Sequence, residues 1–229
     1  DYLLALINDV LQMNKMESNL LKLEKMSFDI RELILSIVNT FEFSRIQNKN
    51  ELHFQIDDAI PQYLIGDKVR LSQVLMNLVG NAMKFTERGN ISITAKLIDY
   101  SENNAQIYFE VKDDGLGIPE SKQKVIFEEF SQLRSANYNY QGTGLGLPIV
   151  KKLLELFDSE IHLESEEGEG SKFHFNIDFR VDRSPQIPDL FNEQLVTEGV
   201  ESAKNILIVD DNRINQVVTC RILEKQNFN

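Results

Sequence analysis

The sequence predicts an α/β (α+β) fold, a two-layer sandwich in which helices cover one face of a mixed β-sheet. Segments with apolar residues at helical spacing are interspersed with short segments in which apolar and polar residues alternate as in strands. The chain has 229 residues, 42 % of them hydrophobic, and its length corresponds to about one and a half domains. Helices and strands with one apolar face each bury those faces by forming layers.

An apolar stripe of helical period opens the chain. It consists of Leu3, Leu6, Ile7, Val10, Leu11 and Met13. No N-cap precedes Leu3, so we expect this segment to be the end of a longer helix. Its apolar face is either ordinary core or the seam of a dimer.

Two further helices and a strand are expected next. A helix is expected over residues 30–49. Phe28 and Asp29, just before it, match a hydrophobic residue and an N-cap, and Glu32 stands where a capping box has its acid. Residues 52–56 alternate as a strand does. Residues 67–85 carry a strongly apolar helical pattern.

The remaining patterns complete the sheet and lead into a linker. Strands are expected over 91–98 and 107–111, a glycine loop and helix over 142–157, and a hairpin formed by 161–164 and 172–179. The segment 181–204 has two prolines and no periodicity, as in a linker. A short apolar strand over 205–211 and a helix over 212–225 are expected after it.

Composition excludes several classes of protein. The net charge of −12 argues against nucleic acid as the main ligand, because phosphate backbones attract clusters of Lys and Arg. No apolar run approaches the roughly 18 residues of a membrane helix, and the first residues do not resemble a signal peptide. The single cysteine, Cys220, fits a reducing, cytoplasmic setting, in which a small apolar residue on a helix is its ordinary role.

Four polar or glycine-rich patterns follow one another in the sequence. The first, late in an apolar helix, places Asn77 and Asn81 four residues apart on one helix face, and Lys84 follows. The second is a strand that ends at Asp113 and continues as Asp-Gly-Leu-Gly-Ile-Pro to residue 119. Taken alone, the first pattern could equally be a polar stripe that faces solvent, and the second could be a simple tight turn.

The third and fourth patterns come after these. Phe127 and Phe130 stand three residues apart, as an aromatic clamp on a short helix or as plain core. The fourth is Gly-Thr-Gly-Leu-Gly-Leu over residues 142–147, which leads into a helix. Free N–H groups at a helix start can hold anionic oxygens, although such a glycine pattern is weak evidence by itself.

In this order and spacing, the four patterns resemble the N, G1, F and G2 boxes of the histidine kinase ATP-binding domain, a member of the GHKL superfamily that includes the gyrase ATPase. The resemblance covers residues 27–179 and implies the Bergerat-type ATP-binding fold. It also implies ATP and Mg²⁺ as ligands, with oxygen donors around the metal.

The resemblance assigns roles to individual residues. Asp113 would accept a hydrogen bond from the adenine amine, and Gly115 and Gly117 would give the base room. Asn81, with Asn77, would face Mg²⁺ and the phosphates, and Lys84 would contact phosphate; Asn77 and Lys84 are the expected catalytic residues. The other expected nucleotide contacts are Ile118, Phe130, Arg134, Gly142, Thr143, Gly144, Leu145, Gly146 and Leu147.

The expected lid, residues 131–141, departs from the family pattern at two positions. Gln141 stands where the family usually has the first of two glycines, and Tyr138 stands where a basic residue is frequent. Arg134 is the one cation of this segment and the hypothetical substitute for that basic residue.

The flanking segments also resemble parts of histidine kinases. Residues 3–23 look like the end of the second helix of a dimerisation and phosphoacceptor hairpin, which implies a homodimer. None of His53, His162 and His174 matches the acceptor motif, because all three lie in strand-like patterns. The acceptor His is therefore expected upstream of residue 1, and a membrane anchor in the parent protein is left open as an alternative.

The C-terminal segment resembles the start of a receiver domain. Asp210 and Asp211 match the acid pair that helps to bind Mg²⁺ in that family, the alternative being a surface acid pair. The expected domains are a phosphoacceptor helix over 1–26, the ATP-binding domain over 27–180, the linker over 181–204 and the receiver fragment over 205–229. A hinge is expected near Met26.

The predicted function is that of the catalytic core of a hybrid histidine kinase. It would bind ATP with Mg²⁺ and phosphorylate the upstream His, for relay to a receiver Asp, a response regulator or a downstream phosphotransfer protein. ATPases of sister families carry a Glu as general base four residues before the metal-binding Asn, and Asn77 stands in that place. Hydrolysis by water is thus disfavoured, whereas an ATP-binding module without transfer activity remains the alternative.

Overall fold

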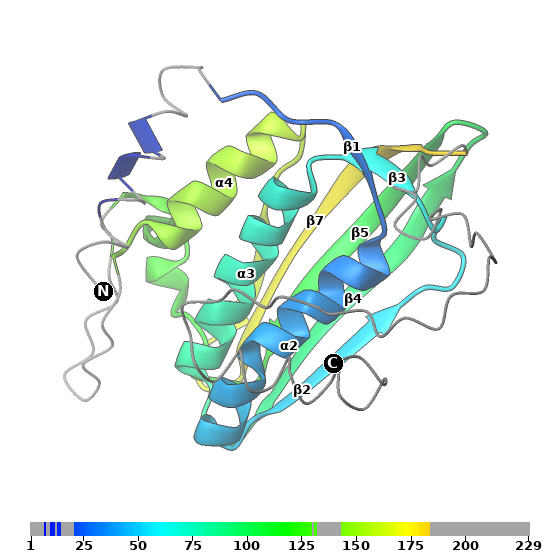
Figure 1. The fold of residues 1–229 in the computed structure, drawn as a ribbon. Coiled ribbons are helices and arrows are strands. Elements are labelled where there is room, and N and C mark those ends of the chain that lie inside the picture. The colour runs from blue at the N-terminus through cyan, green and yellow to red at the C-terminus, as the bar shows by residue number, and fades with distance from the viewer. Residues whose placement is uncertain are drawn as a thin grey trace, which may run out of the picture. The chain divides into compact units, whose positions relative to one another are not determined.

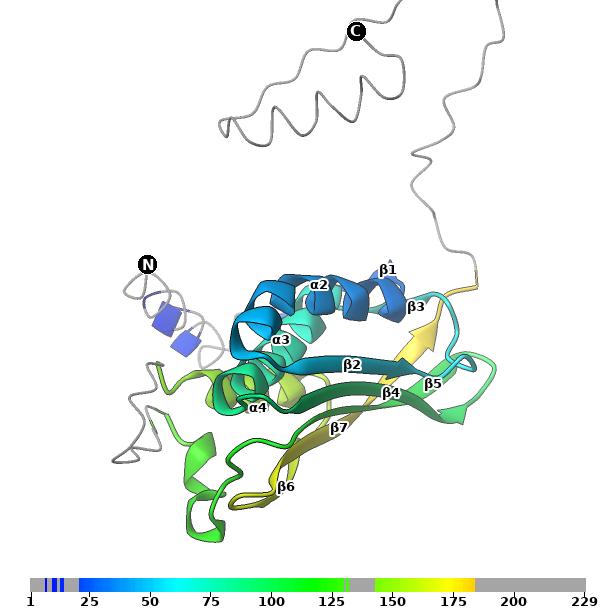
Figure 2. The ribbon, with the colours of Figure 1, turned by 90° about the horizontal axis from the view of Figure 1, so that it is seen from below.

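The computed structural model describes residues 21–129, 131 and 143–183, together with Ile7, Val10, Leu11, Met13 and Asn14. Its centre is a seven-stranded sheet with the strand order β1-β3-β7-β5-β4-β2, and β6 pairs with β7 as well. The helices lie on one face of this sheet (Figures 1 and 2). The predicted two-layer arrangement is confirmed.

The strands are β1 (Met26–Phe28), β2 (Glu51–Ile56), β3 (Leu64–Gly66), β4 (Asn90–Tyr100), β5 (Asn104–Asp113), β6 (His162–Glu166) and β7 (Gly170–Val181). β2 pairs with β4 in parallel, and the other pairs are antiparallel, so the sheet is mixed as expected. The hairpin of β6 and β7 is confirmed, and the three histidines lie on β2, β6 and β7.

Three α-helices cover the sheet in the described part of the chain: α2 (Ile30–Asn48), α3 (Lys68–Phe85) and α4 (Gly146–Leu156). Asp29 caps α2 as predicted, accepting a hydrogen bond from the Arg31 N–H at 2.7 Å. Asp67 caps α3 through the Arg70 N–H at 2.9 Å. Two short 3₁₀ helices, Glu120–Lys122 and Val125–Phe127, precede α4.

The core lies between the two layers. Alternate residues of β5 and β7, among them Phe109 and Phe175, turn toward the helices and are fully buried, with their rings stacked at 5.2 Å. The apolar face of α3, which includes Leu71, Leu75 and Leu78, meets them from the other layer. This contact fixes α3 against the end of β5.

Strands β1 and β3 were not expected from the sequence. Their pairing, Met26 with Gly66 and Phe28 with Leu64, makes residues 26–28 part of the sheet edge. The hinge expected near Met26 is therefore wrong in its position, because that residue lies in a hydrogen-bonded strand.

The segments at both ends of the chain lie largely outside the described residues. Met13 is buried and Val10 packs against the same apolar cluster, which agrees with the core alternative for these two positions. The linker beyond Arg183, Cys220 and the receiver-like segment 205–229 lie outside the description. No helix among the described residues has the length and apolarity to cross a membrane.

Candidate nucleotide-binding site

Asp113 is the last residue of β5 and lies on the buried side of the sheet. Ala105, Ile107, Phe109 and Val111 alternate before it, and all of them are buried. The same alternation places the Asp113 side chain under the helix layer, where it is 6 % exposed. A carboxylate is thus held at the end of an otherwise apolar row.

Burial raises the pKa of Asp113 from 3.8 to about 6, and the charge of Asp114 adds to the effect. Backbone hydrogen bonds from Gly115, at 3.0 Å, and from Ser171 lower the pKa and offset part of the burial effect. Ser171 stands directly opposite Asp113 in the pairing of β5 with β7. The carboxylate is oriented by these donors, and its ionised form gains from a further donor on a ligand.

The glycines of the following loop allow the chain to approach itself closely. A Cβ at Gly115 would lie 2.4 Å from the carbonyl oxygen of Phe85, and one at Gly117 would lie 1.8 Å from that of Glu166. Gly117 also has a φ of +64°. The protein's own backbone therefore fills most of the space beside these two glycines. The structure thus gives a reason for glycine at these positions that differs from the one expected from the sequence, which was room for the base.

Ile118 is anchored to the hairpin of β6 and β7. Its N–H donates to the Ser165 hydroxyl at 2.8 Å, and its carbonyl accepts from Gln123 Nε2 at 3.0 Å. Gln123 Nε2 also donates to the Ser165 carbonyl at 2.8 Å. The loop after Asp113 is thus tied to the hairpin, and the Ile118 side chain is 8 % exposed.

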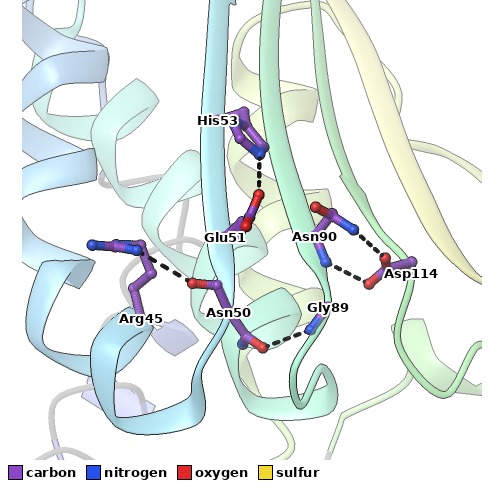
Figure 3. A network of polar contacts seen from close by, with 7 residues as sticks. All are labelled: Arg45, Asn50, Glu51, His53, Gly89, Asn90 and Asp114. Atoms are coloured by element: carbon purple, nitrogen blue, oxygen red, sulfur yellow. Dashed lines mark hydrogen bonds and ion pairs between the residues drawn. The ribbon is translucent and has the colours of Figure 1, made fainter.

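A polar network supports the other side of the loop (Figure 3). Asp114 accepts from the backbone N–H of Asn90 at 2.7 Å and from its side-chain amide at 2.8 Å. Asn50, which is 2 % exposed, donates to the Thr86 carbonyl at 2.8 Å and accepts from the Gly89 N–H at 3.2 Å. These contacts hold the turn after α3 against the start of β4, so the second acid of the pair has a structural role.

Thr86 has a buried hydroxyl close to Asp113. Its Oγ1 is the one buried side-chain polar atom without a hydrogen-bond partner in the part of the chain that the structure describes. Thr86 Oγ1 and Asp113 Oδ1 lie 2.7 and 2.9 Å from the point that a Cβ of Gly115 would occupy. An unsatisfied buried hydroxyl beside a buried carboxylate suits a site completed by a polar ligand or a water molecule.

Asn77, Asn81 and Lys84 lie on α3 beside its apolar face, and all three are half-buried. Asn77 Nδ2 donates to the Gly146 carbonyl at 3.5 Å. The Asn81 carboxamide has no partner among the described residues. Burial lowers the pKa of Lys84, and its Nζ lies 4.8 Å from the centre of the Phe85 ring. Two amide oxygens and a cation are a donor set that fits a polyphosphate with Mg²⁺.

The described part of the glycine loop meets α3 at Asn77. Gly144 has a φ of +73°, and the Leu145 N–H donates to the Thr143 hydroxyl at 3.3 Å before α4 begins at Gly146. Leu145 is fully buried and Leu147 packs against the core, so these two side chains serve packing. The backbone at the start of α4 is the part that could contact an anion.

The remaining predicted residues are not all placed. Phe127 packs against the core, which agrees with the core alternative. Phe130, Arg134, Tyr138, Gln141, Gly142, Asp210 and Asp211 lie outside the described residues. Two surface grooves of about 590 and 500 Å³ flank residues 118–127, and of the predicted site residues only Ile118 lines one of them. The placement of side chains, not a groove, defines the candidate site.

Sequence reasoning did not identify Asn50, Ser165 or Ser171, and it predicted no role for Thr86, the last residue of the pattern that contains Asn77 and Asn81. The contacts of these residues join parts of the chain that are far apart in the sequence. Asp114 lies within the predicted pattern that follows Asp113, but no role was predicted for it.

The chain matches known proteins over most of its length. It is 34 % identical over 234 residues to hybrid signal transduction histidine kinase K of Dictyostelium discoideum, covering 98 % of this chain and 19 % of that protein. It is 40 % identical over 186 residues to the signal transduction histidine-protein kinase BarA of Escherichia coli K12, covering 81 % and 20 %. The chain therefore spans about a fifth of the length of these relatives.

A solved structure has the same fold. Full-length ShkA, crystallised in complex with AMPPNP, matches with a TM-score of 0.70 and 28 % identity, over 98 % of this chain and 44 % of that one. The family model for histidine kinase-, DNA gyrase B-, and HSP90-like ATPases matches residues 66–181, just over half of the chain. This match runs from the end of β3 through α3, Asp113 and the glycine loop to the end of β7. The chain therefore belongs to that ATPase family, with hybrid sensor histidine kinases as its relatives.

Proposed function

We propose that this chain is the catalytic core of a hybrid histidine kinase, which binds ATP with Mg²⁺ and transfers the γ-phosphoryl group to a histidine on a preceding segment. The contact between Asn77 and Gly146 carries the proposal. It joins the asparagine motif on α3 to the glycine motif 69 residues later, and the loop after Asp113 contacts the C-terminal end of the same helix at Phe85. In the proposal, these two motifs and the Asp113 motif border one nucleotide-binding region.

Asp113 would select the base. Its carboxylate already accepts from Gly115 and Ser171, so an incoming amine hydrogen-bonds to an oriented acceptor. A base that presents a carbonyl there would be repelled by the carboxylate and would give it no further donor. We therefore expect adenine to bind and guanine to be rejected.

The residues of α3 would position the phosphates. The carboxamide oxygens of Asn77 and Asn81 are hard donors, and the Lys84 cation sits in a partly desolvated environment in which its attraction to phosphate is stronger. Mg²⁺, when bound with ATP, would neutralise charge on the phosphate oxygens. Positioning and charge neutralisation would supply most of the catalysis.

The transfer itself would need little acid–base chemistry. A neutral imidazole nitrogen attacks the γ-phosphorus, the bond to the β-phosphate oxygen breaks, ADP leaves, and the imidazole releases its other proton to solvent. Asn77 cannot take a proton from water at neutral pH, and this supports transfer to histidine over hydrolysis.

The partners follow from the same proposal. The apolar residues before Met13 would belong to a dimeric phosphoacceptor helix, and the residues after 204 to a receiver domain that accepts the phosphoryl group on an aspartate. The names of the relatives, hybrid and signal transduction histidine kinases, support this arrangement. The proposal also includes the domain boundaries: the ATP-binding domain begins at residue 27, the linker at residue 181 and the receiver segment at residue 205.

A labelled-phosphate transfer assay tests the proposal. The chain is mixed with Mg²⁺, γ-labelled ATP and the helical hairpin that precedes it in the full protein. Label is expected on the hairpin in an acid-labile, base-stable form, and Asn77→Ala should reduce its rate more than tenfold. Asn39→Ala, an exposed asparagine on α2, serves as the control.

The outcomes separate the candidate functions. ATP binding without label on the hairpin would favour the signalling module without transfer activity, which the departures at Tyr138 and Gln141 motivate. Steady phosphate release by the chain alone would favour a hydrolysing ATPase and would contradict the role given to Asn77.

A further inference from the structure

The segment that enters the ATP-binding domain is fixed to it at two levels. Phe28, in β1, is buried, and its ring lies edge-on to Phe179 at 5.6 Å. Gly66, opposite Met26 in β3, leaves no room for a side chain, because a Cβ there would lie 2.9 Å from the Phe179 ring. The Met26 side chain is 62 % exposed, so side-chain packing holds this strand at Phe28, while Met26 is held by the backbone pairing with Gly66.

Asp67 provides a further restraint, on the residues just before this strand. It follows β3 directly and is 4 % exposed. Its Oδ1 accepts from the Arg70 N–H and caps α3, and its Oδ2 accepts from the Glu24 N–H at 2.9 Å, across 43 residues of chain. One carboxylate thus joins the start of α3 to the residues that lead into β1.

Asp29 shows what a cap alone requires. It begins α2, is 8 % exposed, and accepts from the Arg31 N–H with one oxygen. A single acceptor is sufficient to cap a helix, and Ser, Thr or Asn serve equally well. The second oxygen of Asp67 is therefore not needed for the helix, and its bond to Glu24 is a separate feature of this position.

We propose that Asp67 is a positioning residue, which fixes the direction in which the phosphoacceptor segment leaves the ATP-binding domain relative to α3. This inference rests on the proposed function. α3 is a continuous helix from Lys68 to Phe85, so Asn77 lies about 15 Å along it from Asp67, at 1.5 Å per residue. The helix that begins at Asp67 thus carries the residues that face the phosphates, and the incoming chain is bonded to its first turn.

The positioning matters because transfer depends on geometry. A nucleophile on a separate segment reacts efficiently only when it is held near the phosphorus in the right orientation, and a small misplacement lowers the rate strongly. Loss of the bond between Asp67 and Glu24 should therefore lower the transfer rate without lowering the affinity for ATP.

Two variants remove this bond by different routes. Asp67→Asn keeps one oxygen for the cap and cannot accept both N–H groups. Glu24→Pro removes the N–H itself and leaves Asp67, α3 and the core untouched. Asp29→Asn is the matched control, because it alters an aspartate cap that holds its helix only.

Hydrogen exchange and kinetics are measured together. Hydrogen exchange on this chain should show the Glu24 amide exchanging at least tenfold faster in Asp67→Asn, while the amides of α3 beyond Arg70 keep the wild-type rate. In the full-length protein, both variants should lower kcat for transfer at least tenfold, with KM for ATP within twofold of wild type. Asp29→Asn should match wild type in every respect.

Three results would overturn the inference: an unchanged Glu24 amide in Asp67→Asn, wild-type kcat in both variants, or a raised KM for ATP in place of a lowered kcat. Failure of the proposed function would look different. The wild-type protein would then transfer no phosphoryl group, while the exchange rates would still decide whether the Asp67 contact holds the segment.

Discussion

The burial of Asp113 has a cost to stability. Burial raises its pKa to about 6, so near neutral pH the folded protein holds an ionised carboxylate in a largely apolar setting. A pKa raised from 3.8 to about 6 corresponds to about 3 kcal/mol of lost stability as an upper bound. A donor from the ligand would recover part of this free energy.

The pH dependence of Asp113→Asn tests this cost. Between about pH 4 and 6 the folded state binds more protons at this site than the unfolded state, so this site's contribution to the free energy of unfolding decreases as pH rises and is constant above. The variant lacks the effect and should exceed the wild type in stability by about 1–3 kcal/mol at pH 7.5, but by much less at pH 4. Urea unfolding of the nucleotide-free chain measures the difference. A difference that is equal at both pH values would contradict the assignment.

Residue chemistry was readable from the sequence only where a local pattern carried it. Asp113 stands at a strand end before two glycines, and Asn77 and Asn81 share a helix face, so their types and spacing pointed to a site. No pattern predicted a role for Asn50 or Thr86. Asn50 matters because it is buried and bonds backbone atoms of Thr86 and Gly89, more than 30 residues away in the chain. Thr86 matters because its buried hydroxyl has no partner among the described residues.

At the level of elements, most helices and strands were predictable, and the two strands of three residues were not. α2, α3 and the strands β4, β5 and β7 appear at or near their expected positions, because each has enough residues for a period to show. β1 and β3 have three residues each, which is too few for any period. They exist because they pair with each other and with the end of β7.

The loop between β5 and the first 3₁₀ helix depends on its contact with the turn between β6 and β7. Gly117→Ala should destabilise the chain by more than 2 kcal/mol, because a left-handed φ costs about 1 kcal/mol for alanine and the Cβ would overlap the Glu166 carbonyl. Gly168→Ala is the matched control. It has a φ of +89° and nothing within 4 Å of its Cβ position, so it should cost only the φ penalty. Chemical unfolding compares the two, and equal losses would mean that the loop is not held against the turn.

On the scale of the whole molecule, the sheet and its three helices are complete within residues 26–181. The order of the strands could not be read from the sequence, because it depends on which edges meet. The fold class could be read from the sequence, because elements that each have one apolar face can form only a few layer arrangements. The parallel pair of β2 and β4 became possible because α3 and β3 lie between them in the chain.

A fragment of residues 21–183 should therefore fold by itself. It retains every described strand and helix of the two layers and the residues of the site, and it loses the packing of Val10 and Met13 on the core. We expect one cooperative thermal transition, a melting temperature a few degrees below that of the whole chain, and an affinity for ATP within twofold. A fragment that lacks a cooperative transition would show that the core extends beyond these residues.

The central claim is that Asp113, α3 and the start of α4 together bind ATP with Mg²⁺. Calorimetric titration of the chain with ATP, with and without Mg²⁺, tests it most directly, with Asp113→Asn and Asn81→Asp as variants. Asp99→Asn, an equal change of charge at an exposed position of β4, is the control. The expected result is saturable, Mg²⁺-dependent binding in wild type and control, lost or weakened more than tenfold in both variants. A folded wild-type chain that binds no ATP, or an Asp113→Asn variant that binds it equally well, would contradict the claim.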